Sequence, residues 1–262
     1  MPHLVRDGIR LYFEDAGRGA PPLLFVHGWT CNHSMFAPQI EAFRGRHRVV
    51  AVDLRGHGQS DKPEQAYTMR AFADDLAWLC RELGIQRPVV IGHSMGGVIA
   101  LTLAAHHPEV PGAIVTVDSP ILPPRAVVEN LAPFLEALRG PGYREAQRAF
   151  IANVLFIPTD NPAIRDRVIE TMTSAPQHVM ASAFENIFAS DHAALVAACR
   201  VPWLALYAAH INTDLLELRR LCPHVTTGQT VGAGHFQQLE VPDQVNAMIA
   251  RFLAVSGVEA ST

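Results

Sequence analysis

Short apolar runs alternate with longer helical stretches along most of the chain, and this alternation constrains the fold more than any other feature. The runs are PLLFV at 22–26, RVVAV at 48–52, PVVI at 88–91, AIVTV at 113–117 and WLALY at 203–207. Runs of this kind are typical of buried strands in a mostly parallel sheet with helices on both faces. Asp7-Gly8 lies between two further strand-like segments and predicts a hairpin turn near the start. The sequence therefore predicts an α/β fold.

The alternation stops between residues 121 and 190. This stretch contains helix-like blocks separated by Pro or Gly and no clear strand, and the alternation resumes at 191. We therefore expect residues 1–120 and 191–262 to form one α/β core and residues 121–190 to form a helical cap, or lid, inserted into it. The stretch carries Phe, Tyr and Met residues: Phe134, Tyr143, Phe150, Phe156, Met172, Met180, Phe184 and Phe188. We expect most of them to pack the cap and the rest to line an apolar pocket roof.

Helix signals elsewhere in the chain give further expectations. Residues 68–83 place Phe72, Leu76, Leu79 and Leu83 at spacings of three and four, which predicts an amphipathic helix. Residues 34–43 are expected to form another helix, with Ser34 as its N-cap.

The composition excludes several classes of protein. Hydrophobic residues make up 49% and charged residues 18% of the 262, which excludes a disordered chain. The formal net charge of −4 provides no basic excess for nucleic-acid binding. The sequence contains no run of about 18 apolar residues, so it predicts no membrane span. No secretory signal is visible. The four cysteines are scattered without a CxxC motif, which favours a reducing cytoplasmic location. The oligomeric state is not indicated by the sequence.

The segment Gly92-His93-Ser94-Met95-Gly96 fits the pattern G-x-S-x-G and lies between a predicted strand and a predicted helix. In that position a serine adopts a strained turn that lifts its hydroxyl above the edge of the sheet. Small residues on either side are needed because larger side chains would clash in the turn. We therefore interpret Ser94 as a nucleophile, the alternative being an ordinary Gly-rich turn.

A serine hydroxyl needs a neighbouring base, and that base needs an acid to orient it. Of the thirteen histidines, His235 is the best candidate because it lies in the Gly-rich loop after the last predicted strand. Such a loop lies at the carboxyl edge of the sheet, where Ser94 is also expected.

Two carboxylates compete for the role of the acid. Asp118 directly follows the strand AIVTV, beside the nucleophile strand, and its alternative role is a turn residue before Pro120. Asp214 precedes LLELRRL, where it would cap a helix. We favour Asp118 and keep Asp214 as the alternative acid.

Acyl transfer also needs donors for a developing oxyanion. The backbone N–H groups of Trp29, which follows an early strand, and of Met95, next to Ser94, are the candidates. We reject a metal site because no histidine–carboxylate cluster has the spacing of metal ligands.

Four motifs in order carry a resemblance to a known family: HGW at 27–29, DLRGHGQSDKP at 53–63, GHSMGG at 92–97 and GAGHF at 232–236. Together they resemble the α/β-hydrolase fold superfamily, in its cap-bearing serine esterase-like branch. The resemblance implies an eight-stranded sheet, a catalytic triad, an oxyanion hole and no cofactor. The loop after WLALY lacks the family's usual acid, and some members carry that acid one strand earlier, where Asp118 stands.

A serine nucleophile argues against the branches of this family that use aspartate. We expect hydrolysis of a carboxylic ester or lactone of an apolar or aromatic small molecule through an acyl-enzyme on Ser94. The alternative enzyme is a carbon–carbon bond hydrolase that acts on a ring-fission diketone with the same triad. A ligand receptor that keeps the fold without the chemistry is a further alternative, but it predicts a broken triad.

Overall fold

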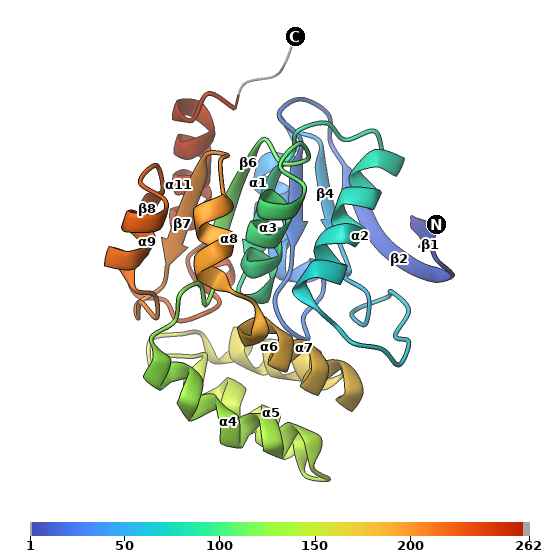
Figure 1. The fold of residues 1–262 in the computed structure, drawn as a ribbon, viewed down its shortest axis with the longest axis vertical. Helices are drawn as coiled ribbons and strands as arrows, with labels where there is room; N and C mark the ends of the chain where they lie inside the picture. Colours follow the sequence, from blue (N-terminus) through green and yellow to red (C-terminus); the bar gives the residue numbers. More distant parts are fainter. Residues whose placement is uncertain (1, 259–262) are drawn as a thin grey trace.

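The computed structural model describes residues 2–258, so Met1 and residues 259–262 of the expected core lie outside the described part. An eight-stranded sheet runs through the molecule in the order β1-β2-β4-β3-β5-β6-β7-β8 (Figure 1). The strands are β1 (His3–Arg6), β2 (Ile9–Ala16), β3 (Leu23–Val26), β4 (Val49–Val52), β5 (Val89–His93), β6 (Ala113–Val117), β7 (Trp203–Tyr207) and β8 (Thr226–Gln229). Strand β2 pairs antiparallel with β1 and β4, and the remaining pairs are parallel, which confirms the predicted sheet.

Each central strand is buried on both faces, which explains why the strands read as unbroken apolar runs. Successive side chains point to opposite sides. In β3, Leu24 and Val26 join the larger core cluster, whereas Leu23 and Phe25 join a smaller cluster on the other face.

Helices cover both faces of the sheet (Figure 1). The larger core cluster includes residues of α2 (Met69–Glu82), α3 (Met95–His106) and α8 (His192–Ala198), and the smaller one includes residues of α1 (Ala37–Phe43) and α11 (Pro242–Val255). Helix α9 (Leu215–Leu221) leads into the edge strand β8, and the short α10 (Gln237–Glu240) precedes α11. Helix α3 is apolar and buried around most of its surface, so it fixes where its first turn lies relative to the sheet.

Residues 121–190 form four helices between β6 and α8: α4 (Arg125–Arg139), α5 (Tyr143–Val154), α6 (Pro162–Thr173) and α7 (Gln177–Ala189). They lie together beyond one end of the sheet (Figure 1). Helix α7 contributes five buried residues, whereas α4 contributes only Leu138. The role of this stretch as a cap, or lid, inserted into the core stays a prediction.

The start of the predicted helix 34–43 is wrong. A 3-10 turn, η1 (His33–Phe36), comes first, and Asn32 caps it by accepting a hydrogen bond from the backbone N–H of Ser34 at 3.0 Å. The Ser34 hydroxyl also donates to Asn32 and therefore does not act as the cap. The α-helix begins only at Ala37, with Pro38 in its first turn, where the missing N–H of proline costs no intrahelical bond.

Candidate active site

Ser94 lies in the sharp turn between β5 and α3. Its φ of 53° and ψ of −119° are strained values for a residue with a side chain. The turn depends on glycine at both flanks, because a Cβ on Gly92 would overlap the carbonyl of Gly96 and a Cβ on Gly96 would overlap the carbonyl of Val26. The backbone N–H of Ser94 donates to Val117 of the neighbouring strand at 2.9 Å. The geometry is that of the turn predicted from the sequence.

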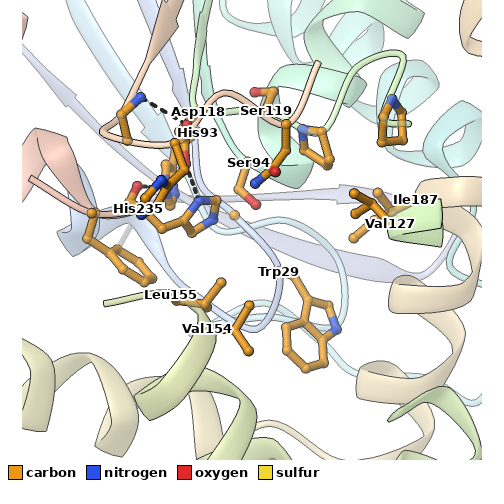
Figure 2. A pocket seen from close by; sticks show the side chains of 18 of the residues that line it. Trp29, His93, Ser94, Asp118, Ser119, Val127, Val154, Leu155, Ile187 and His235 are labelled. Atoms are coloured by element: carbon orange, nitrogen blue, oxygen red, sulfur yellow. Dashed lines mark hydrogen bonds and ion pairs between the residues drawn. The ribbon is translucent and has the colours of Figure 1, made fainter. Parts of the chain in front are cut away.

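The side chains of Asp118 and His235 are hydrogen-bonded to each other at the same end of the sheet. The Nδ1 atom of His235 lies 2.6 Å from Oδ2 of Asp118, and each side chain is 16% exposed. The second oxygen of Asp118 accepts the backbone N–H of Ala208 at 3.0 Å, which fixes the carboxylate. Because Nδ1 must donate to the carboxylate, Nε2 of a neutral His235 is left as an acceptor. Figure 2 shows Ser94 and His235 beside the same cavity.

Asp214 lies elsewhere and performs the capping role considered from the sequence. Its Oδ1 atom accepts the backbone N–H groups of Leu216 at 3.1 Å and Glu217 at 3.0 Å, at the start of α9. The structure thus brings Asp118, and not Asp214, to His235.

His93 is buried directly beneath His235. Its Nε2 atom donates to the backbone carbonyl of His235 at 2.9 Å, and the two rings are 4.7 Å apart. Burial holds the pKa of His93 well below its ordinary value, and the neighbouring His235 lowers it further. The ring is therefore neutral, and it connects β5 to the loop that carries His235.

The two proposed oxyanion donors are the backbone N–H groups of Met95, which directly follows Ser94, and of Trp29. Met95 is the first residue of α3, so its N–H has no intrahelical acceptor. Trp29 follows β3 and lines the pocket. Its indole N–H donates to the carbonyl of Met180 in α7 at 2.9 Å, a contact that sequence reasoning did not foresee. No motif signals such a pairing, because it joins residues 151 positions apart.

A pocket with a cavity volume of about 190 Å³ contains Ser94, Asp118 and His235 in its wall (Figure 2). Much of the remaining lining is apolar and comes from residues 121–190: Val127, Leu131, Phe150, Val154, Leu155, Ile157, Met172, Phe184, Ile187 and Phe188. Among the residues that the structure describes, no Lys or Arg lines this pocket. The cavity therefore suits an uncharged, largely apolar group next to Ser94.

The Phe, Tyr and Met residues of the 121–190 segment divide between packing and lining, and four of the eight, Phe150, Met172, Phe184 and Phe188, line the pocket. Phe150 and Phe184 line the pocket and pack with Trp29 and Phe134 in one aromatic cluster. Phe156 does not line the pocket and instead stacks on Phe236, next to His235.

Neither a metal cluster nor a membrane span is found in the described part of the chain. Among residues 2–258, no group of three or more His, Cys, Asp and Glu side chains is placed to hold a metal ion. No helix in the same range is both long and apolar enough to cross a bilayer.

Comparison with known proteins identifies the family. The family described as alpha/beta hydrolase fold matches residues 21–159, which is more than half of the chain. The chain belongs to the alpha/beta hydrolase fold family. The AB hydrolase superfamily protein YisY from Bacillus subtilis is 28% identical over 281 residues, which cover 96% of this chain and 99% of that protein.

Solved structures share the fold over nearly the whole chain. A thermophilic esterase from Thermogutta terrifontis is 28% identical with a TM-score of 0.84, and the match covers 99% of this chain and 98% of that one. Est816, an N-acyl homoserine lactone degrading enzyme, is 25% identical with a TM-score of 0.83, covering 96% of this chain and 100% of that one. The family and these neighbours support a hydrolase.

Proposed function

We propose that this protein is a serine hydrolase that cleaves a carboxylic ester or lactone of an apolar or aromatic small molecule. The observation that carries the proposal is the 2.6 Å contact between His235 and Asp118 beside a serine in a strained strand-to-helix turn. The likeness to an esterase and to a lactone-degrading enzyme supports the choice of reaction.

In the proposed cycle, the Ser94 hydroxyl attacks the carbonyl carbon while Nε2 of His235 takes its proton. Asp118 holds the ring in the required tautomer and stabilises the imidazolium that forms. Hydrogen bonds from the backbone N–H groups of Trp29 and Met95 stabilise the negative charge on the carbonyl oxygen. His235 then gives its proton to the leaving alcohol oxygen, and an acyl-enzyme on Ser94 remains. Water, deprotonated by the same ring, releases the acid and restores Ser94.

The pocket lining supports an apolar substrate. Phe150, Phe184, Ile187 and Leu155 contribute apolar surface close to Ser94, and the described lining includes no cation to pair with a charged acyl group. A ring-fission diketone acid, the substrate of the alternative carbon–carbon bond hydrolase, would bring a carboxylate that finds no such partner here. We therefore prefer the ester or lactone hydrolase.

Residues 121–190 act in this proposal as a lid. They supply the roof of the pocket, and Val154 at the end of α5 lines the cavity although it is 61% exposed. Such a residue marks the mouth through which a substrate reaches Ser94.

The test combines covalent labelling with turnover. A fluorophosphonate probe should label the wild-type protein on Ser94, and aryl esters should be hydrolysed. Ser94→Ala should abolish labelling and lower kcat by about 10⁴-fold or more. The matched control is Ser174→Ala, which removes an exposed hydroxyl that donates only to Thr171. Equal labelling of the Ser94 and Ser174 variants would contradict the proposal, as would hydrolysis of a vinylogous keto-acid in preference to every ester.

A further inference from the structure

The loop that carries His235 is attached to the segment between α5 and α6. The backbone N–H of His235 donates to the carbonyl of Leu155 at 3.0 Å. The preceding N–H, that of Gly234, donates to Oδ1 of Asp160 at 2.9 Å, and Oδ2 of the same carboxylate accepts the N–H of Ile157 at 2.8 Å. One buried carboxylate thus joins the His235 loop to the 121–190 segment.

Asp160 fits this position better than any neutral side chain would. The residue is only 9% exposed, and an ionised carboxylate accepts hydrogen bonds on both oxygens without offering a donor. Bonds from backbone N–H groups to a charged oxygen are stronger than those between neutral groups. Glycine at 234 is needed for the approach, because a Cβ there would overlap Oδ2 of Asp160. The rings of Phe156 and Phe236 stack with their centroids 5.4 Å apart, which adds an apolar contact between the same two segments.

The backbone of His235 is therefore held from two directions. Leu155 accepts its N–H from the 121–190 segment, and His93 donates to its carbonyl from β5. The loop is also bonded to the core at Ala233, whose carbonyl accepts the backbone N–H of Ala209 at 3.0 Å. Gly232, by contrast, adopts a φ of +77° with open space around it, so this part of the loop depends more on its remaining contacts. A small displacement of the loop would separate the ring from Asp118 or from Ser94.

We propose that Asp160 is a positioning residue that holds the imidazole of His235 in the correct place relative to Asp118 and Ser94. It acts through the backbone of Gly234 and does not touch the substrate. The assignment rests on the proposed serine hydrolase function, but it makes a separate statement about the geometry of His235. The 121–190 segment then contributes to the catalytic geometry as well as to the roof of the pocket.

The experiment compares Asp160→Ala and Asp160→Asn with a control, Asp166→Ala. Asp166 lies in the same segment, but its side chain is 72% exposed, and its one hydrogen bond within residues 2–258 comes from the neighbouring Arg165, at 3.4 Å. Two properties are measured in each variant. The first is the downfield proton NMR signal of the His235 Nδ1–H that is bonded to Asp118. The second is kcat and KM for an aryl acetate, whose small acyl group needs little of the roof.

In Asp160→Ala we expect kcat to fall about 10- to 100-fold with KM within about threefold, because misplacement of a catalytic group by about 1 Å costs on that order. The His235 signal should broaden or disappear. The kcat of Asp160→Asn should lie between those of the wild-type protein and Asp160→Ala. The amide oxygen of asparagine can accept the N–H of either Gly234 or Ile157, but its NH₂ group then faces the other N–H and cannot accept it. Asp166→Ala should leave the signal, kcat and KM unchanged.

Folded Asp160 variants with an unchanged signal and unchanged kcat would overturn the assignment. If Asp160→Ala does not fold, the His235 proton signal and the kcat of Asp160→Asn test the assignment instead. If the wild-type protein hydrolyses no ester and binds no fluorophosphonate, the proposed function fails. The NMR signal then still decides whether Asp160 positions His235.

Discussion

Ser94 and His235 are held in place by different means. The turn at Ser94 is fixed inside the core, by the glycines at 92 and 96 and by a backbone bond to β6. The loop at His235 is held partly by the core, through His93 and Ala209, and partly by Leu155 and Asp160, about 75 to 80 positions earlier in the chain. The proposed nucleophile is therefore positioned by the core alone, whereas the proposed base is positioned by the core together with the 121–190 segment.

The largest expected effect concerns the acid that orients the base. Asp118→Asn should lower kcat by about 10⁴-fold, because a neutral amide favours the wrong tautomer of His235 and removes the partner of the imidazolium. The matched change Asp214→Asn should alter kcat less than about twofold, because asparagine caps a helix about as well as aspartate does. Steady-state kinetics on one aryl ester gives kcat for both variants. A larger loss of kcat in Asp214→Asn than in Asp118→Asn would assign the acid to Asp214.

A pair of glycine substitutions tests the two modes of support directly. Gly96→Ala should destabilise the protein by about 3 kcal/mol or more, because the added Cβ overlaps the backbone carbonyl of Val26 and the strand cannot retreat. Gly232→Ala, in the His235 loop, should cost only about 1–2 kcal/mol of left-handed strain, since its Cβ would enter open space. Chemical denaturation gives both values, and equal losses would show that the two turns are equally constrained.

His93 connects the two turns, and its burial predicts a dependence of stability on pH. Its pKa in the folded protein lies well below the ordinary value, so the unfolded chain binds the proton more readily. The contribution to stability is therefore full above about pH 6.5 and falls as the pH drops below it. His93→Gln, which keeps a donor for the carbonyl of His235 but does not titrate, should flatten the slope of unfolding free energy against pH by up to about 1.4 kcal/mol per unit between pH 6.5 and 5. An unchanged slope would mean that His93 is protonated in the folded state.

The smallest expected effect comes from the roof of the pocket. Each methylene that enters the apolar lining should contribute about 0.8 kcal/mol, which raises kcat/KM about three- to fourfold per carbon until the cavity is full. A series from acetate to hexanoate esters measures this. A steady decrease along the series, or a preference for charged acyl groups, would exclude an apolar acyl pocket.

The sequence predicted the parts of the site that depend on local chain geometry. The strand, the turn residues and the position after the strand pointed to Ser94 and Asp118, and the two contacts of Asp118 with His235 and Ala208 agree with that choice. The four helices of residues 121–190 were also visible, because Pro and Gly separate them.

The contacts between the core and residues 121–190 could not be predicted from the sequence. Asp160 stands in a Thr-Asp-Asn-Pro stretch, which is what an ordinary turn before a helix looks like, and Asn161 does cap α6. Its bond to Gly234 spans 74 residues, and no periodicity records a pairing over that distance. The same holds for Gln147, whose amide donates to Thr30 at 3.0 Å. Ser34 was misassigned for a different reason, since Asn32 and Ser34, two positions apart, both suit a helix cap.

The place of Asp118 at the end of β6 has a consequence for how this enzyme could be redesigned. The loop that follows β7 carries no acid, yet His210 and Asn212 of that loop line the pocket and are exposed. Only its first residue, Ala208, is tied to the acid, through its backbone N–H. Positions 210–212 can therefore be randomised, or the loop lengthened there, without removing a charge from the proposed catalytic residues. A library confined to those three positions is the most economical place to search for new substrate selectivity.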